Sequence, residues 1–338
     1  MIMSRTPFRI SLFGGGTDYP AWYREHGGAV VGATINKYCY ISYRHLPPFF
    51  EHRHRIVYSR IELPQYLDEI QHPAVRAILR EYNIHDGVEI QHHGDLPARS
   101  GMGSSSSFTV GLLNALRAHY GQASSAEFLA QEAIRIEQEV ICEAVGSQDQ
   151  VWAAYGGINM IRFHTDGRFE VMPVIMTAER RQELQSHLLL FFTRFSRNAD
   201  VIAARKIENL QSRRAQLFCM HKMAEQAMII LQNPAHRIAE IGHLLHDSWR
   251  LKKELADCVT TEAIDQMYTA AMDAGALGGK LLGAGGGGFM LIFAEPHQHE
   301  AIRAALRDLI EVSFEIGSPG SRIVIYEPNG LGARSQWA

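Results

Sequence analysis

The sequence predicts an α+β protein of two domains, and three observations support this fold class. Strand-like apolar runs dominate the first half of the chain and helical patterns the second, without the regular alternation of a doubly wound α/β fold. Pro173 is followed by a polar stretch at residues 175–187, which is typical of a boundary. At 338 residues and 46% hydrophobic content, the chain can bury two adjoining cores. We therefore expect domains over 1–180 and 181–338.

Apolar runs and helical periodicity place the individual elements. Short runs rich in apolar residues predict strands at 8–13, 29–43, 88–92, 157–163, 188–195, 289–293 and 322–326. Longer periodic segments predict helices at 104–119, 125–144, 199–231, 236–256, 260–274 and 297–311.

Charge and cysteine content narrow the functional classes. A formal charge of −3 gives no global attraction to nucleic acid or to an anionic membrane, so any phosphate recognition must be local. Cys39, Cys142, Cys219 and Cys258 are widely spaced, without a Cys-x-x-Cys pair, which is typical of a reduced protein. The N-terminal residues lack the apolar core of a signal peptide. We expect a cytoplasmic protein without nucleic-acid or membrane partners.

Four consecutive glycines, Gly285 to Gly288, stand between two apolar runs. Residues 274–294 are apolar or glycine apart from Lys280, a length that could span a membrane. Eight of these positions are glycine, however, and each costs about 1 kcal/mol of helix propensity. A G-x-G-x-x-G dinucleotide fingerprint would open a helix, whereas the strand-like run 289–293 follows. We favour a loop that closely approaches a phosphate site built elsewhere.

Residues 95–108, Asp-Leu-Pro-Ala-Arg-Ser-Gly-Met-Gly-Ser-Ser-Ser-Ser-Phe, have the outline of an anion site. The first turn of a helix has free N–H groups, glycines let the backbone curl around a phosphate, and serine hydroxyls add donors or a magnesium ligand. A Ser-capped helix after a turn is the alternative, but one serine suffices as a cap. The predicted phosphate-binding residues are Gly101, Met102, Gly103, Ser104, Ser105, Ser106 and Ser107.

The first strand runs into Gly14 to Gly16, followed by Thr17 and Asp18. This arrangement places a carboxylate where the backbone can close on a small polar ligand. An ordinary strand-ending turn, with Asp18 as a cap, is the alternative.

Two further carboxylates stand out at and just after the predicted helix 125–144. On a helical wheel Glu137 lies in the middle of the apolar face, where an ionised carboxylate is costly unless it is paired or bound to a metal. A buried salt bridge is the alternative. Asp149 follows the helix in a polar loop, where it could accept a hydroxyl proton or merely decorate the helix end.

Together, and in this order, the segments resemble those of the galactokinase, homoserine kinase, mevalonate kinase and phosphomevalonate kinase family, the GHMP kinases. Arg9 and Asp18 match the arginine and aspartate of the family's Pro-Gly-Arg-x-Asn-Leu-Ile-Gly-Glu-His-Thr-Asp-Tyr opening. The serine-rich segment is similar to its Pro-x-x-x-Gly-Leu-Gly-Ser-Ser loop, with Met102 for Leu, and the last segment to its Gly-Ala-Gly-Gly-Gly loop. The resemblance extends from residue 5 to about 326. It implies a first domain like domain 2 of ribosomal protein S5, a ferredoxin-like second domain, and the cofactors ATP and Mg²⁺.

The resemblance also implies roles for single residues. In galactokinase-like sequences a magnesium-binding glutamate stands twelve residues before the catalytic aspartate, as Glu137 stands before Asp149. Ser105 aligns with the magnesium serine, and the serines on either side are alternatives. Arg9 would neighbour Asp149 and hold it ionised, so these two are the expected catalytic residues.

The substrate side departs from galactokinase, whose Glu-His is replaced here by Gly15-Gly16, and this predicts a roomier pocket. The form Arg-x-Ser-x-x-Gly-Gly-Gly-Thr-Asp resembles the branch of D-glycero-D-manno-heptose 7-phosphate kinases, which phosphorylate the anomeric hydroxyl. A distal phosphate would need a cationic grip. The expected substrate residues are Gly15, Gly16, Thr17, Asp18, Lys37, Arg194, Arg197, Gly285 and Gly286.

The expected function is an ATP-dependent sugar 1-kinase that converts heptose 7-phosphate to heptose 1,7-bisphosphate for surface-polysaccharide precursors. A fucokinase-like kinase and a catalytically silent sugar-sensing protein are the alternatives. Retention of Arg9, Glu137 and Asp149 argues against the silent protein. The expected partner is a small sugar phosphate, and assembly as a homodimer stays open.

Overall fold

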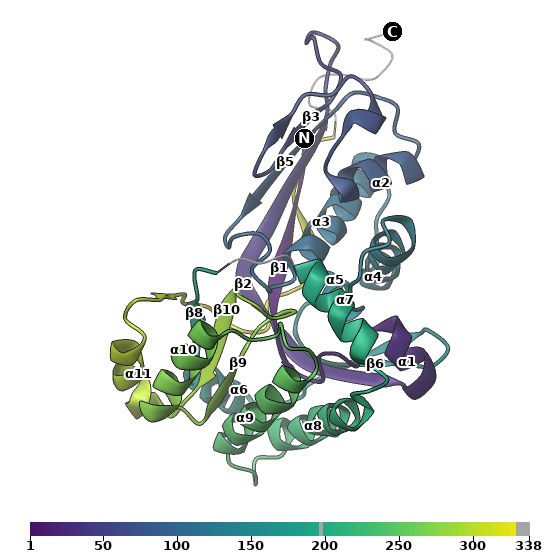
Figure 1. Cartoon of the computed structure of the whole chain (residues 1–338). Helices are drawn as coiled ribbons and strands as arrows, with labels where there is room; N and C mark the ends of the chain where they lie inside the picture. The colour runs from purple at the N-terminus through teal and green to yellow at the C-terminus, as the bar shows by residue number, and fades with distance from the viewer. Residues whose placement is uncertain (196–198, 329–338) are drawn as a thin grey trace.

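The structure is a computed structural model that describes residues 1–195 and 199–328. It confirms the predicted α+β class. Figure 1 shows two long strands, β1 and β2, extending along the molecule, with helices α2 to α5 beside one end and a smaller sheet with further helices at the other. In the described part of the chain, eight strands form the first sheet in the order β12-β1-β2-β5-β3-β4, with β6 on β2 and β7 on β6. These strands are β1 (Ile2–Phe13), β2 (Gly28–His45), β3 (Arg55–Val57), β4 (Ile61–Glu62), β5 (Val88–Gly94), β6 (Ile158–Phe163), β7 (Phe169–Pro173) and β12 (Arg322–Tyr326).

The second sheet has the strand order β11-β8-β10-β9. Of its two central strands, β10 is buried along its whole length and β8 at every residue except Phe192. Its strands are β8 (Leu188–Phe192), β9 (Gly278–Leu281), β10 (Phe289–Phe293) and β11 (Ile310–Glu311).

Helices complete both layers, and several begin at side-chain caps of the expected kind. Ser125, Thr177 and Thr261 each accept a hydrogen bond from a backbone N–H in the first turn of α4, α6 and α10. The α-helices are α1 (Pro20–His26), α2 (Pro73–Glu81), α3 (Ser104–His119), α4 (Ala126–Arg135), α5 (Gln148–Tyr155), α6 (Ala178–Ser186), α7 (Ala199–Asn209), α8 (Arg214–Gln232), α9 (Ala239–Glu254), α10 (Glu262–Asp273) and α11 (His299–Ala305). Short 3₁₀ turns lie at Leu67–Glu69 and Pro296–Gln298, and a π-helix at Ile136–Val140.

Three predicted helices need correction. The helix expected over 125–144 ends as an α-helix at Arg135 and continues as the π-helix, whose Ile141 N–H donates to the Ile136 carbonyl. The helix expected over 199–231 breaks between α7 and α8, where the Ser212 hydroxyl donates to the Asn209 carbonyl and competes with helical bonding. The segment 297–311 forms only α11 before its end joins the second sheet as β11.

Tertiary contacts determine one strand that the sequence missed and the placement of another that it predicted. Strand β9 contains Gly278 and Gly279, which disfavour a strand on propensity. A Cβ added to Gly278 would lie 2.0 Å from the Gly242 carbonyl oxygen, so the glycine allows α9 to pack directly on this strand. Strand β12 pairs with β1, which means that the end of the described chain returns to the first sheet although the sequence grouped it with the second domain.

The apolar run 274–294 forms the strands β9 and β10 with the glycine loop between them, so it is not a membrane span. No helix of the described residues is long and apolar enough to cross a bilayer.

The two sheets meet through direct contact of two glycine-bearing loops. A Cβ on Gly101 would lie 2.7 Å from the Leu282 carbonyl oxygen, and one on Gly288 would lie 2.1 Å from the Ser100 carbonyl oxygen. Gly288 also has φ +106°, a conformation that other residues rarely adopt. The serine-rich loop and the C-terminal glycine loop therefore form one backbone-to-backbone seam.

This seam predicts that Gly288→Ala destabilises the fold beyond the cost of its positive φ. Gly121 is a matched control because it has φ +70° with nothing within 4 Å of an added Cβ. We expect Gly121→Ala to cost about 1–2 kcal/mol of unfolding free energy, and Gly288→Ala at least about 2 kcal/mol more. Urea unfolding of both variants measures the difference, and equal losses would contradict the seam.

Candidate active site

Arg9 and Asp149 form a two-pronged ion pair where β1 meets α5. Arg9 Nε donates to Asp149 Oδ1 and Nη2 donates to Oδ2, both at 2.7 Å. The remaining Arg9 Nη1 donates to the Gly101 carbonyl oxygen at 2.6 Å. The side chain of Arg9 is 5% exposed and that of Asp149 is 23% exposed. The guanidinium is therefore fixed by paired bonds, and the carboxylate is the part that a substrate can reach.

Local backbone structure aims both side chains. The pairing of β1 with β2 shifts register between Pro7 and Arg9, and such a bulge redirects the following side chain. The Arg9 N–H donates to the Met102 carbonyl at 3.1 Å, which joins β1 to the serine-rich loop. Asp149 lies in the first turn of α5, where the helix dipole favours a negative charge.

The serine-rich loop lies against this ion pair. Gly103 has φ +75°, and a Cβ there would be 3.3 Å from Arg9 Cγ and 3.4 Å from Asp149 Oδ2. Helix α3 begins at Ser104 immediately after it, so the free N–H groups of its first turn adjoin the carboxylate. This is the arrangement needed to bring a phosphate group next to a proton acceptor.

The predicted loop residues differ in their surroundings. Met102 is fully buried, and Ser107 is buried and donates to the Pro7 carbonyl at 2.9 Å. Both side chains therefore anchor the loop to the core and do not face a ligand. The Ser104 hydroxyl accepts from the Arg99 N–H at 3.2 Å. Ser105 is exposed, whereas the buried Ser106 points to Glu137.

Glu137 is buried at 1% exposure on the π-helix, a feature frequent at functional sites. Its Oε2 accepts from Ser106 Oγ at 2.9 Å and from Gln150 Nε2. Its Oε1 is buried without a hydrogen-bond partner, and no ion pair to Glu137 is found between the described residues. Burial raises the pKa of Glu137 to about 7. The salt bridge that the sequence left open is not formed in this part of the chain.

The orphaned oxygen and its neighbouring hydroxyl fit a magnesium ion. Mg²⁺ prefers oxygen ligands and commonly combines one or two carboxylates with water and substrate phosphates. Over the two described ranges, no cluster of three His, Cys, Asp or Glu side chains could hold a metal ion alone. Glu137 Oε1 and a serine hydroxyl could therefore contribute the protein's share of the ligands, and the contact with Glu137 favours Ser106 over Ser105.

The Gly14 to Asp18 segment forms a closed turn beside the pair. Asp18 is 2% exposed, and its Oδ1 accepts from the Gly16 N–H at 2.9 Å. Burial raises the pKa of Asp18, and the charge of Asp149 adds to the shift. Thr17 donates to the Gly14 and Ala29 carbonyls, so it holds the turn rather than facing a ligand.

The sequence missed two polar residues that border this turn. Ser11 Oγ donates to Gln148 Oε1 at 2.8 Å, and both side chains lie within 4 Å of a Cβ added to Gly15. Gln150, which holds Glu137, was also missed. Ser11 is the serine of the Arg-x-Ser form quoted from the sequence, and Gln148 and Gln150 flank Asp149, so these positions were the available signal.

The structure does not place all of the remaining predicted substrate residues near the Arg9–Asp149 pair. The Gly286 N–H donates to the Val259 carbonyl at 2.9 Å, and a Cβ on Gly285 would lie 2.6 Å from the same oxygen, so these glycines pack on the second domain. Lys37 is half-buried on β2, and Arg194 is exposed with φ +61°. Arg197 lies outside the described residues.

Three buried lysines that the sequence did not single out lie near the glycine loop: Lys206, Lys252 and Lys280.

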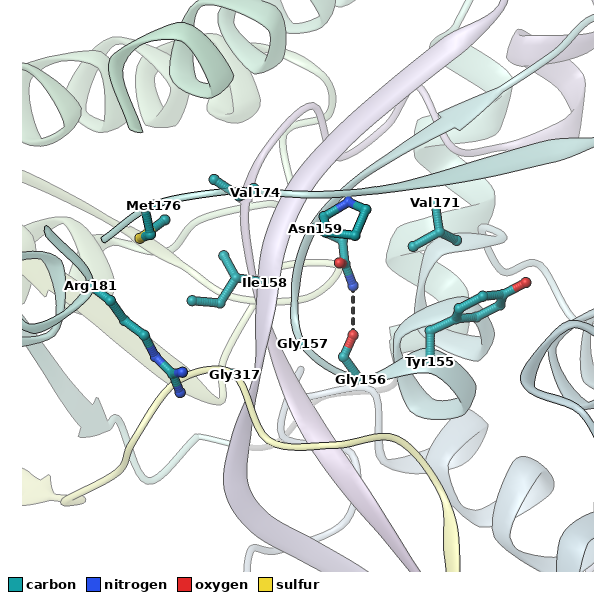
Figure 2. A pocket seen from close by; sticks show the side chains of 11 residues that line it. Tyr155, Gly156, Gly157, Ile158, Asn159, Val171, Val174, Met176, Arg181 and Gly317 are labelled. Atoms are coloured by element: carbon teal, nitrogen blue, oxygen red, sulfur yellow. Dashed lines mark hydrogen bonds between the residues drawn. The ribbon is translucent and has the colours of Figure 1, made fainter. Parts of the chain in front are cut away.

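A cavity of about 570 Å³ lies at the opposite end of α5 from Asp149. Figure 2 shows Tyr155, Asn159 and Arg181 around it, with Asn159 Nδ2 donating to the Gly156 carbonyl. None of the predicted site residues lines this cavity, so the site is defined by the ion pair and the loops rather than by this hollow.

Comparison with known families agrees with this geometry. The model of the GHMP kinases N terminal domain matches residues 69–157, and that of the GHMP kinases C terminal domain matches 226–311, together about half of the chain. The chain belongs to the GHMP kinase family. It is accordingly an ATP-dependent kinase, as the resemblance of its three glycine-bearing segments implied.

Individual relatives agree with the family assignment. The D-glycero-alpha-D-manno-heptose 7-phosphate kinase of Campylobacter jejuni is 29% identical over 317 residues, covering 90% of this chain and 93% of that protein. The bifunctional fucokinase/GDP-fucose pyrophosphorylase of Arabidopsis thaliana is 25% identical over 338 residues, covering 92% of this chain but 31% of that protein.

Solved structures show the same fold. A D-glycero-D-manno-heptose 1-phosphate kinase from Bacteroides thetaiotaomicron has a TM-score of 0.78 at 24% identity, covering 97% of this chain and 100% of the other. Lactococcus lactis galactokinase, complexed with galactose, has a TM-score of 0.72 at 19% identity, covering 95% and 94%. At these identities the likeness concerns the fold alone.

The unpaired Glu137 oxygen predicts that magnesium stabilises the protein through this residue. Adding Mg²⁺ in the presence of ADP should raise the melting temperature of the wild type above that with ADP alone. Glu137→Gln should raise the Mg²⁺ concentration needed for half-maximal stabilisation at least about tenfold, because a neutral amide is a poorer ligand than a carboxylate. Exposed Glu139 on the same π-helix is the control, and Glu139→Gln should respond like the wild type. An equal loss in both variants, or in neither, would exclude Glu137 as the ligand.

Proposed function

We propose that this kinase transfers the γ-phosphate of ATP to the anomeric hydroxyl of D-glycero-D-manno-heptose 7-phosphate, giving heptose 1,7-bisphosphate for surface-polysaccharide precursors. The observation that carries the proposal is the solvent-accessible Asp149 carboxylate, held by Arg9 against the phosphate-binding loop. The choice of sugar is supported by the 29% identity to the Campylobacter jejuni heptose 7-phosphate kinase over nearly the full length of both chains.

The residues of this site are sufficient for the transfer. The anomeric oxygen attacks the γ-phosphorus, the bond from that phosphorus to the ADP oxygen breaks, and the hydroxyl proton passes to Asp149. The paired bonds from Arg9 hold that carboxylate in place before the transfer. The N–H groups at the start of α3 would stabilise charge on the phosphates, since the transition state is loose and depends mainly on positioning and electrostatics.

Mg²⁺ belongs to this proposal, with Glu137 Oε1 and a hydroxyl of the serine run as its protein ligands. When bound, the ion would neutralise negative charge on the triphosphate. The unpartnered oxygen supports Glu137 as ligand, and the 2.9 Å bond to Glu137 supports Ser106.

The buried Asp18 lies close enough to Asp149 to interact with its charge and would accept a hydrogen bond from a sugar hydroxyl. Gly15 leaves room beside it, since the nearest atom to an added Cβ is the Ser11 hydroxyl at 3.7 Å. Lys37, Arg194 and Arg197 stay candidates for binding the distal phosphate.

A cytoplasmic location is supported by four free cysteines, and a homodimer is the assembly to test by light scattering.

The proposal predicts sugar selectivity and dependence on Asp149. With ATP and Mg²⁺, ADP release should be fastest with heptose 7-phosphate and much slower with unphosphorylated heptose or fucose. Asp149→Asn should lower kcat by about 10²–10⁴ because it removes the proton acceptor and keeps the shape. The surface carboxylate Asp166, paired with Arg168, is the control, and Asp166→Asn should leave kcat unchanged.

The alternatives give different results in the same assay. Equal turnover of fucose with none of heptose 7-phosphate would favour a fucokinase-like enzyme. Sugar binding without ADP release from any sugar would favour a sensing protein. Unchanged kcat in Asp149→Asn would remove Asp149 as the proton acceptor.

A further inference from the structure

Three lysines from three different elements bury their ammonium groups beneath the C-terminal glycine loop. Lys206 lies on α7, Lys252 on α9 and Lys280 on β9. They are 5%, 5% and 2% exposed, although lysine is rarely buried without a charged partner. We call this group the lysine cluster.

The hydrogen bonds of the lysine cluster go to backbone carbonyls. Lys252 Nζ donates to the Leu281 and Gly283 carbonyl oxygens at 2.6 and 2.7 Å. Lys206 Nζ donates to the carbonyl oxygen of the next residue, Ala284. Lys280 Nζ donates to the Leu12 carbonyl oxygen at 2.8 Å, at the end of β1. No salt bridge to these ammonium groups joins any two residues that the structure describes, so donor capacity is left over, since each ammonium has three N–H bonds.

The surrounding charges do not balance the lysine cluster. The nearby cation Arg9 is already paired with Asp149, which leaves Asp18 as the remaining carboxylate that interacts with all three lysines. Burial lowers the pKa of Lys206 to about 8 and, together with repulsion from neighbouring cations, that of Lys280 to about 7. Burial and repulsion from neighbouring cations also lower the pKa of Lys252 well below its ordinary value. Burial of three lysines against one carboxylate therefore favours their neutral form, and an anion that bound among them would favour the ammonium form and complete the site.

A neutral amine could also tether a loop carbonyl, so the hydrogen bonds alone do not indicate a ligand. The observation that points to an anion is that three lysines from three elements converge where Asp18 is the carboxylate that interacts with all of them. The cluster also adjoins the substrate side. Leu12, the partner of Lys280, lies just before the turn that carries Asp18, and Gly283, a partner of Lys252, touches Gly101.

We propose that the lysine cluster binds the phosphate group of the acceptor substrate. This identification of the phosphate rests on the proposed function, whereas the anion site itself rests on the three buried ammonium groups. A phosphate dianion offers acceptor oxygens for the unused N–H bonds and neutralises the excess charge. Lysine stems are flexible, so the ammonium groups can turn from carbonyl oxygens toward an arriving phosphate. We therefore prefer the lysine cluster to Lys37, Arg194 and Arg197 as the group that binds the distal phosphate of the sugar.

Binding of inorganic phosphate tests the anion site without turnover. Calorimetric titration is done with ADP saturating the nucleotide loop, so that phosphate does not bind there. We expect Lys206→Met, Lys252→Met and Lys280→Met each to weaken phosphate binding at least about tenfold, since each removes a charged donor. Lys253→Met is the control, because Lys253 is adjacent in sequence but forms an exposed ion pair with Asp265. Its phosphate affinity should match the wild type.

Kinetics then identify the source of the phosphate. The three cluster variants should lower kcat/KM for heptose 7-phosphate at least about tenfold more than for unphosphorylated heptose. An equal fall for both sugars would assign the cluster to the transferred phosphoryl group and overturn the proposal. Unchanged phosphate affinity in the folded variants would overturn it as well. Methionine keeps the length of each side chain but removes its hydrogen bonds to the Ala284, Leu281, Gly283 or Leu12 carbonyl oxygens, so melting temperatures should fall somewhat. Affinities are compared only among variants that are folded at the assay temperature, and three separate variants keep the test valid if one of them unfolds.

The two proposals fail in different ways. If the wild type binds phosphate through the lysine cluster but does not phosphorylate heptose 7-phosphate, the anion site stands and the proposed sugar is wrong. If the wild type phosphorylates heptose 7-phosphate and the cluster variants keep both phosphate affinity and selectivity, the function stands and the lysine cluster is not the grip.

Discussion

The buried Arg9 guanidinium is the constraint on which the site depends. A buried cation must be paired and hydrogen-bonded, and its three donor groups reach Asp149 on α5 and the Gly101 carbonyl of the serine-rich loop. These partners are separated from it by 140 and 92 residues. One side chain therefore fixes strand, helix and loop relative to one another. The carboxylate that we propose as the proton acceptor and the amides that we propose as phosphate ligands are positioned by the same arginine.

Around this ion pair, ionisable groups of both signs lack some of their hydrogen-bond or ion-pair partners. Glu137 keeps one oxygen without a partner, and the lysine cluster keeps unused donors, yet the negative and the positive groups are not paired with each other. Ordinary folding would place them in contact, because mutual neutralisation lowers the cost of burial. Their separation fits a site completed by its ligands, with a metal ion for the carboxylate and phosphate groups for the cations. Binding energy then comes from charges that the fold itself leaves unsatisfied.

The sequence was sufficient to predict the fold class and the proximity of Arg9 to Asp149, because the glycines, Arg9 and the carboxylates stand at fixed spacings. It did not distinguish Ser106 from Ser105, since the start of a helix fixes which hydroxyl turns inward only once α3 is placed. It missed the π-helix within 125–144, because widened turns have no clear propensity signal. It missed the lysine cluster for a different reason. On a helix such as α9 a lysine is ordinarily exposed, and only tertiary packing buries it.

A double-mutant cycle between Arg9→Met and Asp149→Asn, read as kcat/KM with ATP and the preferred sugar, measures directly whether the two side chains act together. If the two side chains act as one unit, the double variant should be about as impaired as the worse single variant, giving a coupling energy of several kcal/mol. Lys253→Met combined with Asp149→Asn provides an uncoupled reference, because Lys253 pairs with Asp265 on α10. Independent, additive losses for the Arg9 and Asp149 variants would contradict the account.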